Sequence, residues 1–345
     1  MEVLFPPSFP GQQYYADMQK YVINNASAPV TGANFAVQWA DIDQGPLVNP
    51  RYDWSSVEHS IGPWAAAGKK VNLILWAVSD SPTNTATPLF VWANLGAAEI
   101  ALCDGEQIPD YFDATNFQTP YLAFIQAALQ KYGSDSRIGY IRIGLGRGGE
   151  TFPGQGFNGT DGGCTNTIVN VWGYTDQKWI TYLTNMMTSA SAANTAKKQL
   201  MVGLVGGAAG GSGSAQGVAD QVAAAAVSVG IGFGSQGLQA ADIPNYPNCT
   251  SDWCNLFNQY SGQVPLELQT VGLSCPAGVG KCPGDANQND TGSLVPLLPF
   301  AASHKVNILE VYFQDWLLAY DPNYPGFGQY GAAYATAIQS AASGQ

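Results

Sequence analysis

Carboxylates are the side chains of this sequence best placed to do chemistry. Leaving aside Glu2 near the N-terminus, only Glu267 in "VPLELQT" and Glu310 in "VNILEVYFQ" lie well inside apolar, strand-like runs. Glu150 follows another such run, "IGYIRIGLG", just past its end. Burying a carboxylate costs free energy unless the group is paired or used. Two carboxylates on either side of a glycosidic bond can protonate the leaving oxygen and attack the sugar or activate water.

The glycines before Glu150 offer a different interpretation. Gly144, Gly146 and Gly149 spell G-x-G-x-x-G after an apolar run, as in a dinucleotide-binding turn. That turn needs a helix to begin at once and an acidic residue about 20 positions later. Here the loop-like "TFPGQGFNGTDGGCTN" follows, and residues 165–172 contain no acidic residue. The pattern therefore favours a backbone turn that presents Glu150 over a phosphate cradle.

Structural roles remain open for each of these carboxylates. Glu150 could be a solvated loop residue, and Glu267 and Glu310 could be buried partners of Arg142 or another core base. Gln269 has the same parity as Glu267, so both side chains should point to the same side of their strand. Arg147 is close enough to Glu150 in sequence to influence its ionisation.

Alternating runs predict the elements that must position these residues. Short apolar runs predict strands over 2–7, 34–40, 70–78, 138–146, 199–206, 230–237, 264–271 and 306–314. Amphipathic or alanine-rich runs predict helices over 12–24, 53–67, 118–132, 174–192, 214–228, 251–260, 291–303 and 329–342. Strict alternation over this length predicts a single (β/α)8 TIM barrel spanning 1–345, with a doubly wound sheet as the main alternative.

Long loops follow several predicted strands, over 79–117, 147–173, 238–250 and 272–290. In a TIM barrel all of them lie on the C-terminal face, where active sites are built. Side chains near these strand ends are our candidates for substrate binding. The aromatic platforms are Trp39, Trp76, Phe152, Tyr312 and Trp316, and the polar candidates are Asp41, Asp43, Asp80, Arg142, Arg147, Gln236, Gln269 and Glu310. Each aromatic could instead be a core residue, and Asp41, Asp43 and Asp80 could be loop or turn caps.

Three stretches carry a likeness to a known group. They are "VQWADIDQGPLVNPRYDWSSVEHSIGPWAAAGKKVNLIL" (37–75), "FQTPYLAFIQAALQKYGSDSRIGYIRIGLGRGGE" (117–150) and "PLELQT" (265–270). They resemble the second and third strands, the third helix with the fourth strand, and the seventh strand of the clan A glycoside hydrolases. That group includes many cellulases, xylanases and β-galactosidases.

The resemblance implies roles for two residues: Glu150 as general acid/base and Glu267 as nucleophile of a retaining hydrolase. One departure concerns Gly149, because the group usually has an Asn there that binds the sugar 2-OH. "GRGGETFP" also resembles the acid segment of β-amylases, which are inverting enzymes. An inverting glycosidase and a catalytically silent carbohydrate-binding barrel therefore stay as alternatives.

The composition of the chain argues against several classes of binding partner. The net charge of −12, from 25 acidic and 13 basic residues, argues against nucleic-acid binding. No basic run attracts a membrane surface, and no apolar stretch approaches the roughly 20 residues of a membrane span. His59 falls inside a predicted helix and His304 next to the end of another, and neither lies at a strand end. Neither a His-based metal site nor a Ser-His-Asp triad is therefore expected. We expect no cofactor or metal, a carbohydrate substrate and a monomer.

Cysteine usage favours an exported protein. Cys249 with Cys254, and Cys275 with Cys282, are spaced like local disulfides within polar loops. Cys103 and Cys164 remain as a third, long-range pair, although six cysteines allow 15 pairings. Four N-x-S/T acceptors fit the same interpretation if the source glycosylates its proteins. We therefore expect secretion.

Overall fold

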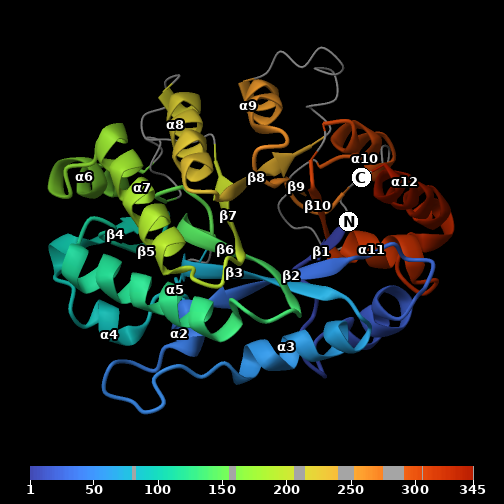
Figure 1. Ribbon diagram of the computed structural model, residues 1–345, viewed down its shortest axis with the longest axis horizontal. Helices are drawn as coiled ribbons and strands as arrows, with labels where there is room; N and C mark the ends of the chain where they lie inside the picture. The colour runs from blue at the N-terminus through green and yellow to red at the C-terminus, as the bar shows by residue number, and fades with distance from the viewer. Residues whose placement is uncertain are drawn as a thin grey trace. The chain divides into compact units, whose positions relative to one another are not determined.

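The computed structural model describes residues 1–79, 83–154, 161–205, 214–239, 252–274, 291–304 and 306–344. Its main sheet is a closed barrel with the strand order β1-β10-β9-β8-β7-β6-β3-β2 (Figure 1). The strands are β1 Glu2–Leu4, β2 Gly32–Gln38, β3 Lys70–Val78, β6 Ile138–Arg147, β7 Gln199–Leu204, β8 Gly232–Leu238, β9 Leu266–Thr270 and β10 Ile308–Tyr312. Closure of the sheet confirms the predicted (β/α)8 TIM barrel and rules out an open, doubly wound sheet.

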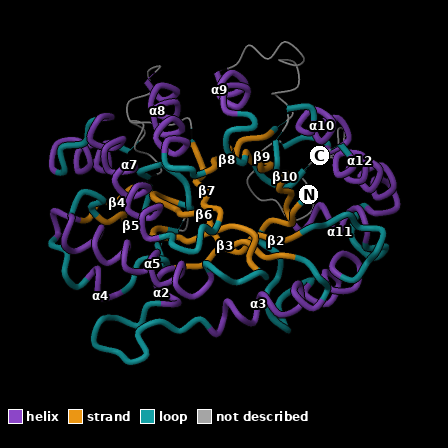
Figure 2. Tube along the Cα trace, in the orientation of Figure 1, coloured by secondary structure: helices purple, strands orange, loops and turns teal. Residues whose placement is uncertain are grey.

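Helices alternate with the barrel strands along the chain (Figure 2). The longer ones are α3 Ser55–Ala66, α5 Thr119–Tyr132, α7 Asp176–Ala193, α8 Ser214–Ser228, α9 Asp252–Tyr260, α10 Leu294–Ala302, α11 Phe313–Tyr320 and α12 Ala332–Ser343. Shorter ones are α1 Tyr15–Asp17, α2 Trp39–Ile42, α4 Leu89–Trp92 and α6 Gly162–Asn166. The helix predicted over 12–24 is mostly a π-helical segment, Met18–Ile23. The helix α11 was not predicted: the strand expected over 306–314 included only its first two residues, and no element was expected over 315–320.

A small hairpin outside the barrel was also missed. Strands β4 (Ile100–Cys103) and β5 (Glu106–Pro109) pair antiparallel, with Cys103 opposite Glu106. The turn between them is Asp104-Gly105, and both residues have positive φ (47° and 85°). An Asp-Gly pair between apolar runs is a strong local hairpin signal.

Contacts divide the chain into two compact units. The first contains Met1–Phe35, Val57–Asn72 and Gly234–Gln345, and the second contains Ala36–Ser56 and Leu73–Phe233. The boundaries fall inside strands β2, β3 and β8 and inside helix α3. A single domain over 1–345 stays a prediction.

The first unit has a polar face on its strands. The register pairs Gln269 of β9 with Glu310 of β10, and Glu310 with Glu2 of β1. Asn34 on β2 and Asn72 on β3 each donate a hydrogen bond of 2.9 Å to Oε2 of Glu2. A side chain that reaches past the adjacent strand to the next one lies on the concave face of a curved sheet, so these groups line the barrel interior.

The second unit has an aromatic core. Trp39 packs against Phe117, Tyr121 and Phe124, with ring centroids 5.2–6.2 Å apart. The hydroxyl of Tyr121 lies 2.6 Å from the carbonyl oxygen of Gly144 on β6. Large rings of this kind fill the space between a barrel strand and its covering helix.

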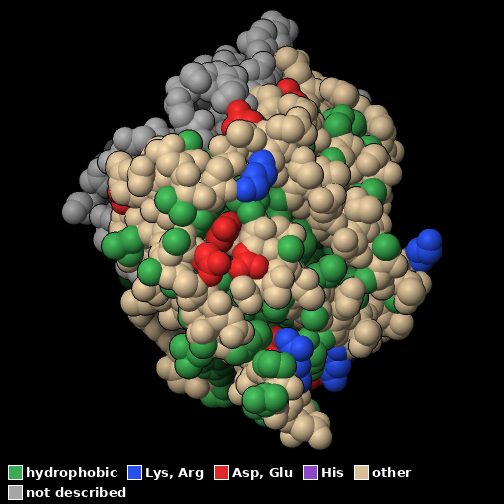
Figure 3. Space-filling model, turned by 90° about the vertical axis from the view of Figure 1, so that its left-hand side faces the viewer, with side chains coloured by type: hydrophobic (Ala, Val, Ile, Leu, Met, Phe, Trp, Pro, Cys, Tyr) green, Lys and Arg blue, Asp and Glu red, His purple; other side chains and the backbone are tan. Residues whose placement is uncertain are grey.

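The surface carries few charges, as expected for a chain with 11% charged residues. On the face shown in Figure 3, some acidic side chains gather in one small group and others lie apart from it, and most of the surface is uncharged. None of the helices in the described parts of the chain combines the length and apolar character needed to cross a bilayer.

Candidate active site

A tight turn after β6 presents Glu150. The N–H of Arg147 donates to the carbonyl of Phe152 (2.8 Å), and the N–H of Glu150 donates to the carbonyl of Arg147 (3.1 Å). The turn is also tied to both neighbouring strands. Gly148 donates to the carbonyl of Val78 at the end of β3 (3.0 Å), and Thr151 donates to that of Gly203 on β7 (2.9 Å). Glu150 itself is half-buried, just past the C-terminal end of the fourth barrel strand.

The glycines of the G-x-G-x-x-G pattern allow the backbone of this turn to pack closely against β6. A methyl group on Gly144 would lie 2.4 Å from the carbonyl oxygen of Leu75 and 2.6 Å from Cα of Gly149. One on Gly146 would lie 2.3 Å from the carbonyl oxygen of Phe152. The chain therefore folds back onto its own strand more closely than any side chain would allow. Residues 151–154 are not helical, so the helix N-terminus that a dinucleotide site needs does not follow the glycines.

Trp76 explains the glycine beside Glu150. Gly149 has φ +78°, and a methyl group on it would lie 2.3 Å from Nε1 and 2.6 Å from Cδ1 of Trp76. The indole of Trp76, which is 8% exposed, thus occupies the space into which a side chain at position 149 would project. Trp76 was predicted to be near the site, and it lies beside the turn that presents Glu150.

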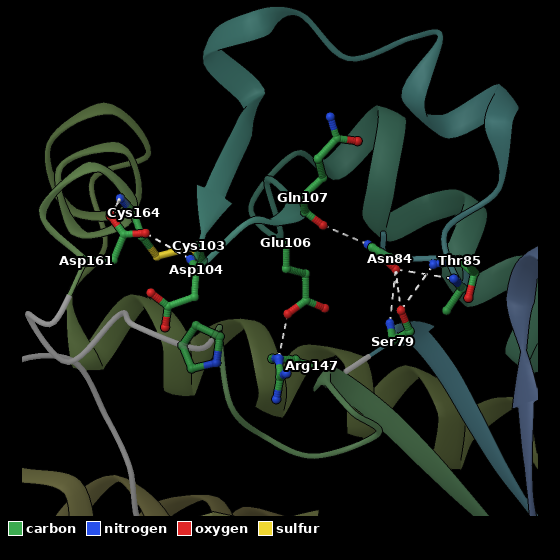
Figure 4. Close-up of polar contacts among 12 residues, drawn as sticks. Ser79, Asn84, Thr85, Cys103, Asp104, Glu106, Gln107, Arg147, Asp161 and Cys164 are labelled. Carbon is green, nitrogen blue, oxygen red and sulfur yellow. Dashed lines mark hydrogen bonds and ion pairs between the residues drawn. A yellow bond between two sulfur atoms is a disulfide. The ribbon is translucent and has the colours of Figure 1, made fainter. Parts of the chain in front are cut away.

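Arg147 forms an ion pair with a second carboxylate, Glu106. Its Nε donates a 2.6 Å hydrogen bond to Oε2 of Glu106, whose side chain is 3% exposed (Figure 4). Glu106 begins β5, and our sequence reasoning did not single it out. The Asp-Gly turn signal just before it would have located the hairpin but not the ion pair.

Glu267 is fully buried on β9. A methyl group on Gly234 of β8 would lie 2.8 Å from Cβ and 3.1 Å from Oε1 of Glu267, so the glycine makes room for this side chain. Glu267 is the second residue of β9, and it precedes Val271, whose N–H donates to Leu238 at the end of β8. Three more residues of β9 follow Glu267 and span roughly 10 Å. Glu267 therefore lies well before the C-terminal end of its strand.

Glu310 lies in the buried polar group on the interior face of the first unit. It is fully buried, and its register neighbours are Gln269, which is 2% exposed, and Glu2. Burial raises the pKa of Glu2, and the charge of Glu310 raises it further, while the amides of Asn34 and Asn72 lower it. Glu310 therefore interacts electrostatically with the buried carboxyl of Glu2, which was left aside in the sequence analysis.

Three predicted substrate contacts are corrected. Trp39 and Trp316 are fully buried, Trp39 in the aromatic core and Trp316 in α11, so neither offers an open ring face to a sugar. Asp43 is 3% exposed and holds the loop after α2. It accepts hydrogen bonds of 2.8 Å from both Nε and Nη2 of Arg51, and one of 3.0 Å from Nε1 of Trp39.

The remaining candidates have mixed positions. Asp41 is exposed on α2, Phe152 is half-buried in the turn after Glu150, and Tyr312 is half-buried at the end of β10, edge-on to Phe5. Arg142 is fully buried on β6. Asp80 and the side chain of Gln236 lie outside the described residues. Within the described parts of the chain, no group of three or more His, Cys, Asp or Glu side chains could hold a metal ion.

A disulfide joins Cys103 to Cys164, which confirms the long-range pair expected from the sequence. It connects β4 with α6, so it closes the hairpin against the segment that follows the Glu150 turn. The two local pairs among Cys249, Cys254, Cys275 and Cys282 fall outside the side chains that the structure describes.

No protein-family model matches the chain, and no curated protein sequence matches it. Solved structures do resemble it. A xylanase from Cellvibrio japonicus matches with TM-score 0.57 and 11% identity, over 100% of this chain and 97% of its own. A GH10 protein from Paenibacillus barcinonensis matches with TM-score 0.52 and 11% identity, over 98% and 94%. A β-galactosidase from the psychrophilic Marinomonas ef1 matches with TM-score 0.57 and 10% identity, over 99% of this chain. The chain spans 58% of that β-galactosidase. At these identities the likeness shows a shared TIM-barrel fold.

Proposed function

We propose that this protein is a glycoside hydrolase whose general acid/base is Glu150. The observation that carries the proposal is the position of Glu150: a half-buried carboxylate on a hydrogen-bonded turn directly after the fourth barrel strand. TIM-barrel enzymes build their active sites on this face. The xylanase and β-galactosidase that share the fold act in the same class of chemistry.

In the proposed retaining reaction Glu267 is the nucleophile. Glu150 donates a proton to the glycosidic oxygen while a carboxylate oxygen of Glu267 bonds to the anomeric carbon and the leaving group departs. Water then attacks the anomeric carbon, Glu150 takes the proton from that water, and the bond to Glu267 breaks. Trp76, Phe152 and Tyr312 are our remaining candidates for contact with the sugar, together with Asp41.

Full burial of Glu267, well before the end of its strand, favours a second candidate. In a carbohydrate-binding barrel without catalysis, Glu267 and Glu310 would be structural, and Glu150 would hydrogen-bond a sugar hydroxyl. An inverting hydrolase would instead need a base farther from Glu150, at about 6.5–9.5 Å rather than about 5–5.5 Å. Secretion, a carbohydrate partner and a monomeric state belong to the same proposal, and the Cys103–Cys164 disulfide supports an oxidising compartment.

A panel of polysaccharides and aryl glycosides tests the proposal with four proteins: the wild type, Glu150→Gln, Glu267→Gln and Glu310→Gln. We expect hydrolysis by the wild type, and losses of about 100-fold or more in kcat for Glu150→Gln and Glu267→Gln on poor leaving groups. Glu310→Gln serves as the buried-carboxylate control and should keep most of the activity. Full activity of Glu150→Gln would exclude the proposed acid/base.

Product stereochemistry separates the mechanisms. Proton NMR of the first anomer released should show retention, and azide should restore turnover to Glu150→Ala with retained configuration and to Glu267→Gly with inverted configuration. Activity that survives in Glu267→Gln but not in Glu310→Gln would move the nucleophile to Glu310. Binding of a glycan without any hydrolysis would favour the silent barrel.

A further inference from the structure

An ion pair holds the end of β6 beside Glu150. Arg147 is the last residue of β6, and its Nε donates to Oε2 of Glu106 over 2.6 Å. The two side chains are 21% and 3% exposed, so the pair is screened from water far better than a surface pair. Charge-assisted hydrogen bonds are short and strong in such surroundings, and removing one partner leaves the other charge buried and unpaired.

The hairpin that carries Glu106 is anchored to α6 (Figure 4). Cys103, opposite Glu106 across the hairpin, is bonded to Cys164, and both cysteines are fully buried. Asp161 joins the same two elements. Its Oδ2 accepts the N–H of Asp104 in the hairpin turn (2.9 Å), while its Oδ1 accepts the N–H groups of Gly163 and Cys164 at the start of α6.

The hairpin also reaches the ends of β3 and of the Glu150 turn. Nδ2 of Asn84 donates to the carbonyl of Gln107 (2.9 Å), and Oδ1 of Asn84 accepts the N–H of Ser79 after β3 (3.0 Å). Just beyond β5, the hydroxyl of Tyr111 donates to the carbonyl of Pro153 (2.9 Å), three residues after Glu150. The turn is therefore held from the hairpin on both sides of Glu150.

We propose that the β4–β5 hairpin positions Glu150 for proton transfer, with Glu106 and Arg147 as positioning residues. The inference rests on the proposed function, since it assigns Glu150 a proton to deliver. Neither residue reacts with the sugar. Their ion pair fixes the strand end from which the turn departs, and the disulfide fixes the hairpin that carries Glu106.

Misplacement of an acid has a specific kinetic signature. A leaving group that departs as a stable anion, such as 2,4-dinitrophenolate, needs no proton in the bond-breaking step, whereas a sugar alkoxide or an alkylphenolate does. A shift of about 1 Å in a catalytic group costs on the order of 100-fold in rate. Loss of folded protein, in contrast, lowers the rate for every substrate by the same factor.

The test compares Glu106→Gln, Arg147→Ala and Arg147→Lys with the control Arg137→Gln in the full-length protein. Arg137 pairs with Asp135 over 2.6 Å just before the N-terminal end of β6, so its variant removes an ion pair next to the other end of that strand. We expect Glu106→Gln and Arg147→Ala to lose about 10- to 100-fold in kcat/KM on poor leaving groups. On dinitrophenyl glycosides kcat/KM, which reports only formation of the glycosyl-enzyme, should change less than about twofold. Arg147→Lys should recover part of the loss, and Arg137→Gln should behave as the wild type.

Amide hydrogen exchange of residues 147–152 provides a readout that does not need activity. Faster exchange there in Glu106→Gln and Arg147→Ala, but not in Arg137→Gln, is the expected result. If the wild type hydrolyses no glycoside, the proposed function fails while exchange still decides whether the hairpin holds the turn. Unchanged exchange, or equal losses of kcat/KM on good and poor leaving groups, would overturn the positioning role.

Discussion

The indole of Trp76 packs directly against the backbone of Gly149, the residue that precedes Glu150. The indole nitrogen lies where a side chain at position 149 would begin, and φ at Gly149 is +78°. The overlap with the indole leaves no room for an Asn side chain here unless Trp76 shifts. Under the proposed function, a hydrogen bond to the sugar 2-OH would have to come from a residue other than Gly149.

Gly149→Ala should destabilise the protein by about 2 kcal/mol or more, because the methyl group clashes with Trp76 and the left-handed backbone is strained. Urea unfolding measures the change. The matched control is Gly68→Ala, at φ +69° with no atom within 4 Å of the added methyl group, which isolates the backbone strain. Equal losses in the two variants would show that the contact with Trp76 contributes nothing.

The β4–β5 hairpin is the element that the predicted barrel did not include. It lies within the long segment 79–117, which we had interpreted only as a loop on the C-terminal face. Its disulfide bridges a sequence separation of 61 residues, and its first β5 residue reaches the end of β6. The hairpin thus connects α6 with the end of β6 without changing the barrel.

Replacing both Cys103 and Cys164 by Ser should lower the free energy of unfolding by about 2–4 kcal/mol, since the unfolded chain regains the freedom of a long loop. Thermal and urea unfolding of the double variant and the oxidised wild type provide the comparison. Wild type reduced with a thiol should approach the double variant. If the double variant unfolds at the wild-type denaturant concentration, the hairpin is held by its hydrogen bonds alone.

At the scale of the whole molecule, several buried carboxyls favour their neutral form. Burial raises the pKa of Asp315 to about 7, against hydrogen bonds from the N–H and hydroxyl of Ser274 that lower it. Burial likewise raises the pKa of Asp110 to about 6 and that of Glu2 above its usual value. These groups bind more protons in the folded state than in the unfolded state between about pH 4 and 7.

Stability should therefore fall as the pH rises from about 4 to 7 and change little above that, because the folded pKa of Asp315 lies above its unfolded value of about 3.9. Asp315 alone can contribute up to about 4 kcal/mol to this difference. Urea midpoints at pH 4.5 and 7.5 measure it, and Asp315→Asn should flatten the profile. Greater stability at pH 7.5 than at pH 4.5 in the wild type would contradict the prediction.

The sequence by itself determined the barrel and the place of Glu150. The spacing of apolar residues along the chain predicts which residues of each strand and helix are buried. This spacing is a local property, so it can be recognised from the sequence. The end of a strand is equally local, so Glu150 could be placed just past β6, and the cysteines left over from the local pairs predicted the bond between Cys103 and Cys164.

Tertiary structure alone decided which polar and aromatic groups meet. Trp39, Asp43 and Trp316 are residue types that often contact sugars, yet all three are buried in the core. Their exposure is decided by neighbours from distant parts of the chain and not by residue type. The same holds for Glu106 with Arg147, which are 41 residues apart, and for Trp76 with Gly149. Contacts between distant segments depend on how strands and loops are brought together, and no local pattern records that arrangement.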